Sequence, residues 1–415
     1  MFIGIDDTDS ERGLCTTYLA AVLMERLQPL GMIMGLPRLI RLNPCARFKT
    51  RGNAALAFQL ESDRPEMVLE VALKTVLELS DFAGANTNPG LVIAEEVTAR
   101  MTGFYRRAVT EILEIEEARS LLDEEGIWYR GFKKGRGLIG ALAAVGSDLP
   151  DFTYELIAYR ERRRWGWPRS IDASSVWKAD ALTYPCTWDT VDHHNSRVVF
   201  APHSGDPVLF GIRGSDPEAI TEAFRTIISE PKERSVLYLT NQGTDAHILE
   251  GEWADTKESQ SYRLHGLVAE PAEAIAGGHL FFALQNGTLR LKCAAFEPTK
   301  NFRNIIKCLI PGDELEVYGS MREGSLNLEK INIIRLAEQE DLTVPLCPQC
   351  KRKMESAGRG QGYRCRPCKT RSAGRERNVR LRDLETGFYE VPPCARRHLS
   401  KPLVRINREK VHPSR

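Results

Sequence analysis

Two clusters of side chains have the types and spacing of chemical sites. The clearer one is a pair of Cys-x-x-Cys motifs, CPQC at 347–350 and CRPC at 365–368, with 14 residues between them. Four thiolates at this spacing are typical of tetrahedral zinc. The segment between the motifs is basic and glycine-rich, with too little apolar content to fold without a metal. The sequence therefore predicts a closed, structural zinc site rather than four unliganded thiols, built from Cys347, Cys350, Cys365 and Cys368.

The segment around these cysteines is strongly basic, and Tyr363 is available for stacking on a base. Residues 346–415 contain 19 Lys and Arg against 6 Asp and Glu, a balance of +13, whereas residues 1–345 have a balance of −12. A basic tail on an acidic body favours a polyanionic partner over a solvated tail with no partner. This composition predicts a nucleic-acid-binding ribbon, in which the candidate RNA contacts are Lys351, Arg352, Lys353, Arg364 and Arg366.

The second cluster is acidic and follows a short apolar stretch. Residues 2–5 (FIGI) predict a buried strand, and DDTDS follows it directly. Ligands of α/β units bind at the carboxyl ends of strands. The carboxylates of Asp6, Asp7 and Asp9 repel one another, and Mg²⁺ accompanying a nucleotide phosphate would offset that repulsion. The alternative is an exposed acidic turn that caps the next helix.

Three glycine-containing segments could hold the phosphates of a nucleotide, since the sequence has no P-loop motif. GLCTT (13–17) offers a glycine turn before a helix start, where free N–H groups favour an anion. KTRGN (49–53) and KKGRG (133–137) combine cations with glycine. The threonines could instead be plain N-caps, and KTRGN a solvated turn. The candidate phosphate ligands are Gly13, Thr17, Lys49, Arg51, Gly52, Asn53, Gly135, Arg136 and Gly137.

A third basic segment, RERRRWGWPR at 160–169, interleaves arginines with two tryptophans. Cations for phosphates beside aromatic faces for unpaired bases favour single-stranded RNA binding, with a salt-bridged surface loop as the alternative. The candidate RNA contacts are Arg162, Arg163, Arg164, Trp165 and Trp167. The roles of His193 and His194 stay open.

Hydrophobic periodicity predicts a multidomain α+β chain of four units. Residues 1–124 form an α/β unit, with helices from Thr16, at Pro65–Leu79 and over 97–124, and with strands at 2–5, 32–42 and 54–60. Residues 125–250 have the ferredoxin-like order βαββαβ, beginning with a strand at 127–132 and a helix at 136–146. A long insertion, 160–206, interrupts this second unit.

The remaining units are a β-rich segment and the basic tail. Residues 255–338 predict five strands with one helix, 301–310, after the third, which is the order of an OB-fold barrel. Residues 340–415 hold the zinc ribbon and the tail.

We expect a cytoplasmic protein, because the sequence has no signal peptide and no apolar run long enough to cross a membrane. The cysteines outside the paired motifs are expected to be buried thiols.

Several longer motifs resemble the archaeal tRNA-isoleucine 2-agmatinylcytidine synthetase family, and the resemblance covers essentially the whole chain. One departure is Asn86, where we expect a lysine before TNPG. The motifs are IGIDDTDS (3–10), GLCTTYLA (13–20), PRLIRLNP (37–44), KTRGN (49–53), KKGRGLIGALAA (133–144), ELIAYR (155–160), ETGFYEVPP (385–393) and RHLSKPL (397–403).

The resemblance implies kinase-like, ferredoxin-like, OB and zinc-ribbon domains, and an ATP-dependent ligase. The family attaches agmatine to carbon 2 of the wobble cytidine of isoleucine tRNA, so that AUA rather than AUG is read. The cytidine carbonyl oxygen is first phosphorylated, and the amine of agmatine then displaces phosphate. By similarity, Asp6, Asp7 and Asp9 would hold Mg²⁺ and the ATP phosphates. Thr16 matches the threonine that becomes phosphorylated, while Lys49, Arg51, Arg136 and Gly137 would steady phosphates or the target nucleotide.

The implied partners are agmatine and isoleucine tRNA, contacted at its anticodon loop and acceptor stem, with no membrane and no required protein partner. A carboxylate and an aromatic face are expected around the guanidinium of agmatine, but the sequence does not identify them. Two other function classes stay open. One is a non-catalytic RNA-binding adaptor in which DDTDS is only a cap, and the other is a small-molecule kinase, which would leave the basic tail unused.

Overall fold

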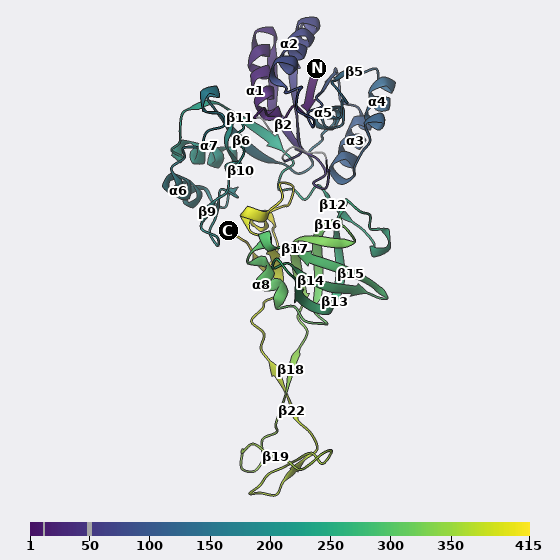
Figure 1. Cartoon of the computed structure of the whole chain (residues 1–415), viewed down its shortest axis with the longest axis vertical. Helices are drawn as coiled ribbons and strands as arrows, with labels where there is room; N and C mark the ends of the chain where they lie inside the picture. The colour runs from purple at the N-terminus through teal and green to yellow at the C-terminus, as the bar shows by residue number, and fades with distance from the viewer. Residues whose placement is uncertain (11–12, 48–51) are drawn as a thin grey trace.

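A computed structural model of the chain describes residues 1–10, 13–47 and 52–415. An α/β body lies at one end of the long axis, a β-barrel follows it, and a small module stands at the far end of a thin stalk (Figure 1). The C-terminal segment returns from the stalk to lie between the body and the barrel. Among the described residues, no helix is long and apolar enough to cross a membrane.

The body is built on one continuous sheet of nine strands in the order β5-β4-β1-β3-β2-β11-β6-β10-β7. Its first half carries helices on both faces. Ile3 and Ile5 of β1 pack with α1 and α2 on one face, while the opposite face packs against α3, α4 and α5. The elements of this half are β1 (Phe2–Asp6), α1 (Thr16–Leu27), β2 (Met32–Arg41), β3 (Ala54–Glu61), α2 (Pro65–Leu79), β4 (Gly90–Ala94), α3 (Ala99–Thr110), α4 (Ile115–Glu124), β5 (Trp128–Gly131) and α5 (Gly137–Val145).

The second half of the sheet continues from the first through a parallel pairing of β11 with β2, in which Leu239 lies opposite Arg38. Two helices, α6 and α7, pack on this half around a core that includes Phe210. Its elements are β6 (Thr153–Arg160), α6 (Ala173–Thr183), β7 (Thr187–Trp188), β10 (Val208–Gly214), α7 (Pro217–Thr226) and β11 (Lys232–Thr240). β8 (Val191–Asp192) and β9 (Arg197–Val198) pair with each other in a separate two-stranded sheet.

The strand and helix expected to begin the second unit lie elsewhere in the structure. β5 pairs with β4 at the edge of the first half, and α5 packs against β1, β3 and β4. Glycines allow this close approach: a Cβ at Gly137 would lie 2.5 Å from the carbonyl oxygen of Asp6. Periodicity identifies the helix but does not show which strand it packs against. β4 was not predicted, and the expected helix at 97–124 is two helices, α3 and α4.

The insertion at 160–206 is partly ordered secondary structure, since it contains α6 and the short strands β7, β8 and β9. Two of the cysteines expected to be buried, Cys186 and Cys308, are exposed. Their sequence neighbourhoods are mixed in polarity, so burial could not be inferred from residue type alone.

The β-barrel contains the five strands and the helix that the sequence predicts for residues 255–338. β13 pairs with β14, β14 with β15, β15 with β17, β17 with β16, and β16 with β13, so the five strands close into a ring. Short outer strands extend it. The elements are β12 (Ile248–Glu250), β13 (Ser261–Ala274), β14 (Leu280–Asn286), β15 (Leu289–Ala295), α8 (Phe302–Lys307), β16 (Glu314–Arg322), β17 (Ser325–Arg335), β23 (Gly387–Glu390) and β24 (Val411–His412).

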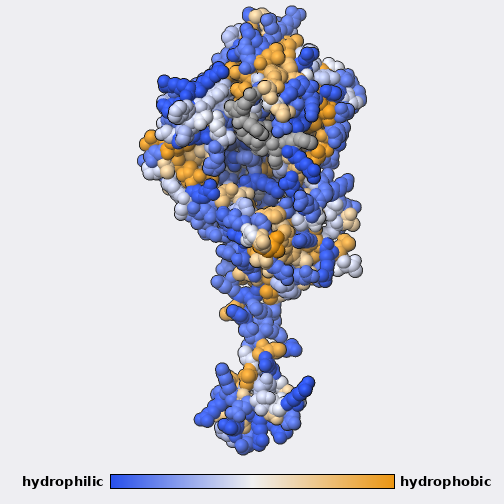
Figure 2. All heavy atoms as spheres, in the orientation of Figure 1, coloured by the Kyte–Doolittle hydropathy of each residue, from blue (hydrophilic) through white to orange (hydrophobic). Residues whose placement is uncertain are grey.

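The stalk consists of two antiparallel strands, β18 (Gln339–Thr343) and β22 (Glu376–Arg380). At its base, Arg382 forms a buried ion pair with Asp313 of the barrel. At its tip, β19 (Glu355–Ser356), β20 (Tyr363–Arg364) and β21 (Arg371–Ser372) form a small module with a mostly hydrophilic surface (Figure 2).

The basic tail divides into two parts with different surroundings. Residues 387–415 lie against both the α/β body and the barrel, where arginines and lysines pair with carboxylates: Arg396 with Asp189, Arg397 with Glu329, Lys401 and Arg405 with Asp151, and Arg415 with Asp180. Much of the charge there is therefore neutralised within the molecule. The cations that remain available to a polyanion are concentrated in residues 346–386.

Candidate functional site

The acidic loop opens onto a cavity of about 830 Å³, including its mouth, at the carboxyl end of β1. Its wall comes from β1, the start of α1, the end of α3 and α5. Asp7 has a left-handed backbone, with φ of 57°. The lining includes Asp6, Asp7, Asp9, Thr16, Asn43, Asn53, Arg136 and Gly140.

Asp9 and Thr16 form the most direct chemical contact in this cavity. The Thr16 hydroxyl donates to Asp9 Oδ1 at 2.7 Å, and the backbone N–H of Thr16 donates to the same oxygen. The Thr8 hydroxyl donates to Thr16 Oγ1 at 3.0 Å. Asp9 thus satisfies an N–H at the start of α1, as the cap interpretation predicts, and also holds the Thr16 hydroxyl. A buried threonine hydroxyl beside a carboxylate can transfer its proton to that carboxylate.

Asp7 and Arg136 form a second pair across the cavity. Arg136 immediately precedes α5, and its Nε and Nη2 donate to Asp7 Oδ2 at 3.1 and 2.9 Å. Nη2 also donates to the carbonyl of Asn86 at 2.9 Å. Arg136 is therefore held by protein carboxylate and carbonyl groups, with its side chain lining the cavity.

Burial dominates the electrostatics of the aspartates. It raises the pKa of Asp6 well above the usual range, and the neighbouring carboxylate of Asp7 raises it further. Burial also raises the pKa of Asp7 to about 6, although Arg136 opposes this shift. A cation entering the cavity would stabilise the charged forms of both groups. The site is thus suited to a ligand that brings positive charge.

The carboxylates do not form a ready metal cluster in the described part of the chain. The four cysteines are the one group there whose ligand atoms are close enough to share an ion, with all four sulfurs within 4.8 Å of one another. Asp7 faces Arg136 and Asp9 faces Thr16, which explains why three adjacent carboxylates do not converge. In the cysteine cluster, the backbone N–H of Cys350 helps to lower the pKa of Cys347 to about 6, which favours the thiolate.

Among the remaining candidate phosphate ligands that the structure describes, Asn53 lines the cavity, whereas Gly13, Thr17, Gly52, Gly135 and Gly137 lie outside its lining. Asn53 donates to the carbonyl of Asn43 at 3.0 Å, whereas Lys49 and Arg51 lie outside the described residues. Gly13 has φ of 116°, which favours glycine. Gly52, Gly135 and Gly137 occupy close approaches, the first beside Arg41, the second beside Gly131 and the third beside Asp6.

Sequence reasoning missed several polar residues of this site. Asn88 is buried, and among the described residues its Oδ1 has no hydrogen-bond partner. Its backbone N–H donates to the carbonyl of Asp7 at 3.2 Å. Thr8 and Gly140 were also missed, and a Cβ at Gly140 would lie 1.9 Å from Asp6 Oδ2. The available signals were TNPG at 87–90 and the glycine that follows KKGRG at position 140.

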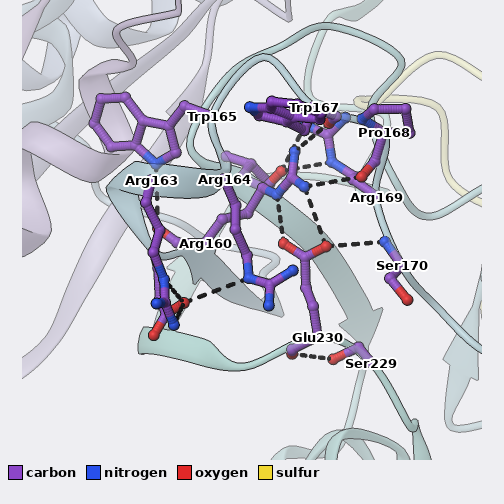
Figure 3. Close-up of polar contacts among 12 residues, drawn as sticks. Arg160, Arg163, Arg164, Trp165, Trp167, Pro168, Arg169, Ser170, Ser229 and Glu230 are labelled. Atoms are coloured by element: carbon purple, nitrogen blue, oxygen red, sulfur yellow. Dashed lines mark hydrogen bonds and ion pairs between the residues drawn. The ribbon is translucent and has the colours of Figure 1, made fainter.

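The arginine–tryptophan segment contains both surface ion pairs and an exposed tryptophan (Figure 3). Arg163 and Arg164 pair with Glu161 on the surface. Trp165 packs edge-on against Tyr18 at 5.0 Å, whereas Trp167 is 71 % exposed and available for stacking. Arg160 is buried, and its ion pair with Glu230, at 2.7 Å, supports the loop from below.

The other predicted contacts have simpler surroundings. His193 Nε2 lies 3.0 Å from Asp180 Oδ2 and its ring packs against Trp177, and the backbone N–H of His194 donates to the carbonyl of Arg415. Arg162 lies over the ring of Trp165. In the distal module, the side chains predicted to contact RNA are all exposed: Lys351, Arg352, Lys353, Arg364 and Arg366.

The fold and the cysteine cluster define a multidomain α+β protein with a C-terminal zinc ribbon. Family models described as the TiaS TCKD domain, the TiaS FLD domain and the TiaS C-terminal zinc ribbon domain match residues 2–64, 135–247 and 344–384. The chain is 49% identical to the isoleucine-tRNA 2-agmatinylcytidine synthetase TiaS of Methanosarcina mazei, over 100% of both chains. It is 48% identical to that of Archaeoglobus fulgidus, over 99% of both. The chain belongs to the TiaS family.

Solved structures agree with this assignment. A crystal structure of TiaS in complex with its isoleucine tRNA and ATP matches with a TM-score of 0.93 and 46% identity, covering 100% of this chain and 99% of that one. A crystal structure of TiaS with the same tRNA, AMPCPP and agmatine matches with a TM-score of 0.90 and 44% identity, at the same coverage.

Proposed function

We propose that this chain attaches agmatine to carbon 2 of the wobble cytidine of an isoleucine tRNA, using ATP. The observation that carries the proposal is the full-length match to TiaS enzymes, including a structure holding the isoleucine tRNA, an ATP analogue and agmatine. The chemistry requires activation, because a carbonyl oxygen is a poor leaving group. Phosphorylation of the C2 oxygen turns that oxygen into part of a good leaving group. The amine nitrogen of agmatine then forms the new C–N bond, and the bond between C2 and this oxygen breaks as phosphate leaves.

The residues proposed for phosphoryl chemistry are those of the acidic cavity. Asp9 is placed to take the proton of the Thr16 hydroxyl, whose oxygen is the proposed acceptor of a phosphoryl group; their separation of 2.7 Å supports this role. Arg136, Gly137 and Asn53 are proposed to steady phosphates, together with Gly13, Gly135, Gly52, Lys49 and Arg51. Thr17 is not among them, because its hydroxyl contacts Cys15 Sγ and lies outside the lining of the cavity. Arg136 would exchange its contact with Asp7 for one with phosphate.

The same residues offer oxygen ligands to a divalent cation beside the nucleotide, provided that Asp7 and Asp9 exchange their contacts with Arg136 and Thr16 for the cation. Asp6 and Asp7 have raised pKa values because of burial, and Asn88 Oδ1 is a buried oxygen with no partner among the described residues. These three oxygen donors and Asp9 would hold Mg²⁺. A bound Mg²⁺ would neutralise phosphate charge. The chain's own contribution is to exclude water from the carboxylates and to orient the threonine.

We also propose a role for each domain of the chain. We propose a kinase-like domain at 1–124 that is completed by β5 and α5, a ferredoxin-like domain over the rest of 125–250, an OB-fold domain at 255–338 and a zinc ribbon with its tail at 340–415. The closed ring of five strands, with α8 between the third and fourth, supports the OB assignment. The exposed cations of the ribbon and the exposed Trp167 support RNA contacts at two separated places.

The decisive experiment incubates the chain with a transcript of the isoleucine tRNA, ATP and labelled agmatine, and then measures label in the RNA. We expect incorporation that depends on ATP and on a cytidine at the wobble position. A transcript with uridine there is the matched control, and elongator methionine tRNA tests selectivity. Tight tRNA binding with no incorporation under any condition would support the adaptor instead. Phosphorylation of a small molecule with no need for tRNA would support the kinase alternative.

A further inference from the structure

Two buried tyrosines from the second half of the sheet contact the start of α1, where Thr16 lies. Tyr159 of β6 and Tyr238 of β11 are both fully buried, and their hydroxyl groups lie 3.0 Å apart. They share a small core with Cys15 and Tyr18, which lie on either side of Thr16 in the sequence. The roles proposed above for phosphate, RNA and metal binding do not involve these phenols.

The hydrogen bonds have a defined direction. The Tyr238 hydroxyl donates to the backbone carbonyl of Thr17 at 3.3 Å. Since a phenol has one hydrogen to donate, Tyr238 accepts from Tyr159. Burial raises the pKa of both phenols above the ordinary value, so both stay protonated at neutral pH. The two phenols thus form a chain of two hydrogen bonds that ends at the backbone carbonyl of Thr17.

Neighbouring residues extend this attachment. Tyr18 packs edge-on against Tyr159 at 5.6 Å and against Trp165 at 5.0 Å, and its hydroxyl donates to Glu233 at 3.3 Å. The Thr17 hydroxyl also lies 3.1 Å from Cys15 Sγ. Successive helical residues point about 100° apart, so Thr17 and Tyr18 can face the second half while Thr16 faces Asp9.

We infer that Tyr159 and Tyr238 are positioning residues for the Thr16 hydroxyl. They hold the first turn of α1 through the backbone carbonyl of Thr17, so that the Thr16 hydroxyl stays within hydrogen-bond distance of Asp9. The inference rests on the proposed role of Thr16 in phosphoryl chemistry. It also assigns a reason for the continuous sheet: the half that carries the arginine–tryptophan loop sets the geometry of the nucleotide cavity.

The test compares Tyr238→Phe and Tyr159→Phe with a matched control, Tyr105→Phe. Tyr105 is also a buried phenol, but its hydroxyl contacts Asn241, at 3.4 Å, and not α1. We expect Tyr238→Phe to lower kcat for agmatine incorporation about tenfold, with KM for ATP changed less than about threefold, because a misplaced group loses orientation rather than binding. Tyr159→Phe should have a smaller effect, since it loses no bond to the backbone. The control should lower kcat less than about twofold.

A second readout does not depend on activity. Hydrogen exchange of the amides of residues 13–20 should be faster in Tyr238→Phe than in the wild type, and unchanged in the control. Unchanged exchange together with unchanged kcat would overturn the inference, and so would equal losses in all three variants. A wild-type chain that incorporates no agmatine would overturn the proposed function, and the exchange measurement would still decide the positioning.

Discussion

The zinc ribbon and the acidic cavity hold their chemical groups in different ways. All four sulfurs of the ribbon come from residues 347–368, in two short turns whose geometry the motif itself specifies. The cavity takes its lining from residues 6–140, and Tyr238, from a distant strand, donates to the backbone carbonyl of Thr17 next to the cavity's Thr16. A two-stranded stalk joins the ribbon to the barrel, away from the body (Figure 1). The cavity, in contrast, is lined by residues of several elements.

This difference shows how local and long-range sites respond to damage. A ribbon held by one metal should fail as a unit and leave the rest of the molecule folded, because few contacts cross the stalk. A cavity assembled from distant elements should keep its fold when one polar group is removed, and lose function instead. Changes at the ribbon and at the cavity test this difference between the two sites.

The largest effect is expected from removing a metal ligand. Cys365→Ser should reduce zinc content from about one ion per chain to near zero and unfold the ribbon. Elemental analysis and limited proteolysis between residues 344 and 384 would show it. ATP binding by the body should not change, and tRNA affinity should fall. If freshly purified wild-type protein held no zinc, the ribbon would not be the metal-dependent unit described here.

The next largest effect is expected at the acidic cavity. Asp7→Asn removes a carboxylate charge, and Thr16→Ala removes the hydroxyl that contacts Asp9. Either should lower agmatine incorporation at least ~100-fold, since a lost metal or nucleophile contact typically costs several kcal/mol in the transition state. Filter binding should give tRNA affinities within about threefold of the wild type. Near-normal incorporation by Asp7→Asn would leave DDTDS as a helix cap only.

The free energy of unfolding should depend on pH because of the buried carboxyl group of Asp7. Because burial raises the pKa of Asp7 to about 6, the folded protein binds this proton more tightly than the unfolded chain. The wild type should therefore gain stability relative to Asp7→Asn as pH falls from 8 through 6, by up to about 3 kcal/mol near pH 4. Urea unfolding of both proteins across this range measures the difference. A constant difference, or one with the opposite sign, would contradict the buried carboxylate.

The smallest effect is expected from salt dependence of tRNA binding. Replacing Lys351, Arg352 and Lys353 with alanine should flatten the plot of log affinity against log salt by about two units. The same change at Arg162, Arg163 and Arg164 should flatten it by about one unit or less, because Glu161 already pairs with two of these arginines. Equal changes in both variants would mean that the loop contributes as many phosphate contacts as the ribbon.

Much of the secondary structure was predictable because it depends on local patterns. The helix at Pro65–Leu79 agrees with its predicted bounds, and the five barrel strands occur in the predicted order. Strand β4 was missed because its five residues follow a turn motif and show no alternation. The placement of α5 was missed for another reason: glycine contacts with β1 and β4 have no periodic signature.

The candidate site was predictable as a set of residue types but not as a set of pairs. DDTDS and GLCTT identified Asp9 and Thr16 as neighbours of one ligand, and the structure joins them by a hydrogen bond. Nothing in the sequence indicated that Arg136 would face Asp7, or that the basic tail would pair with the acidic body. Ion pairs between distant segments depend on folding, so net charge by itself overestimated the surface that is open to RNA.

The sequence by itself determined the metal site, the order of most secondary-structure elements and the family, because each rests on residues close together in the chain or on long matching motifs. Only the tertiary structure decided which carboxylate faces a threonine and which faces an arginine, and that Tyr159 and Tyr238 hold the first turn of α1. The physical reason is burial. A hydrogen bond or charge pair gains its strength from exclusion of water, and which groups are buried together depends on the packing of elements distant in sequence.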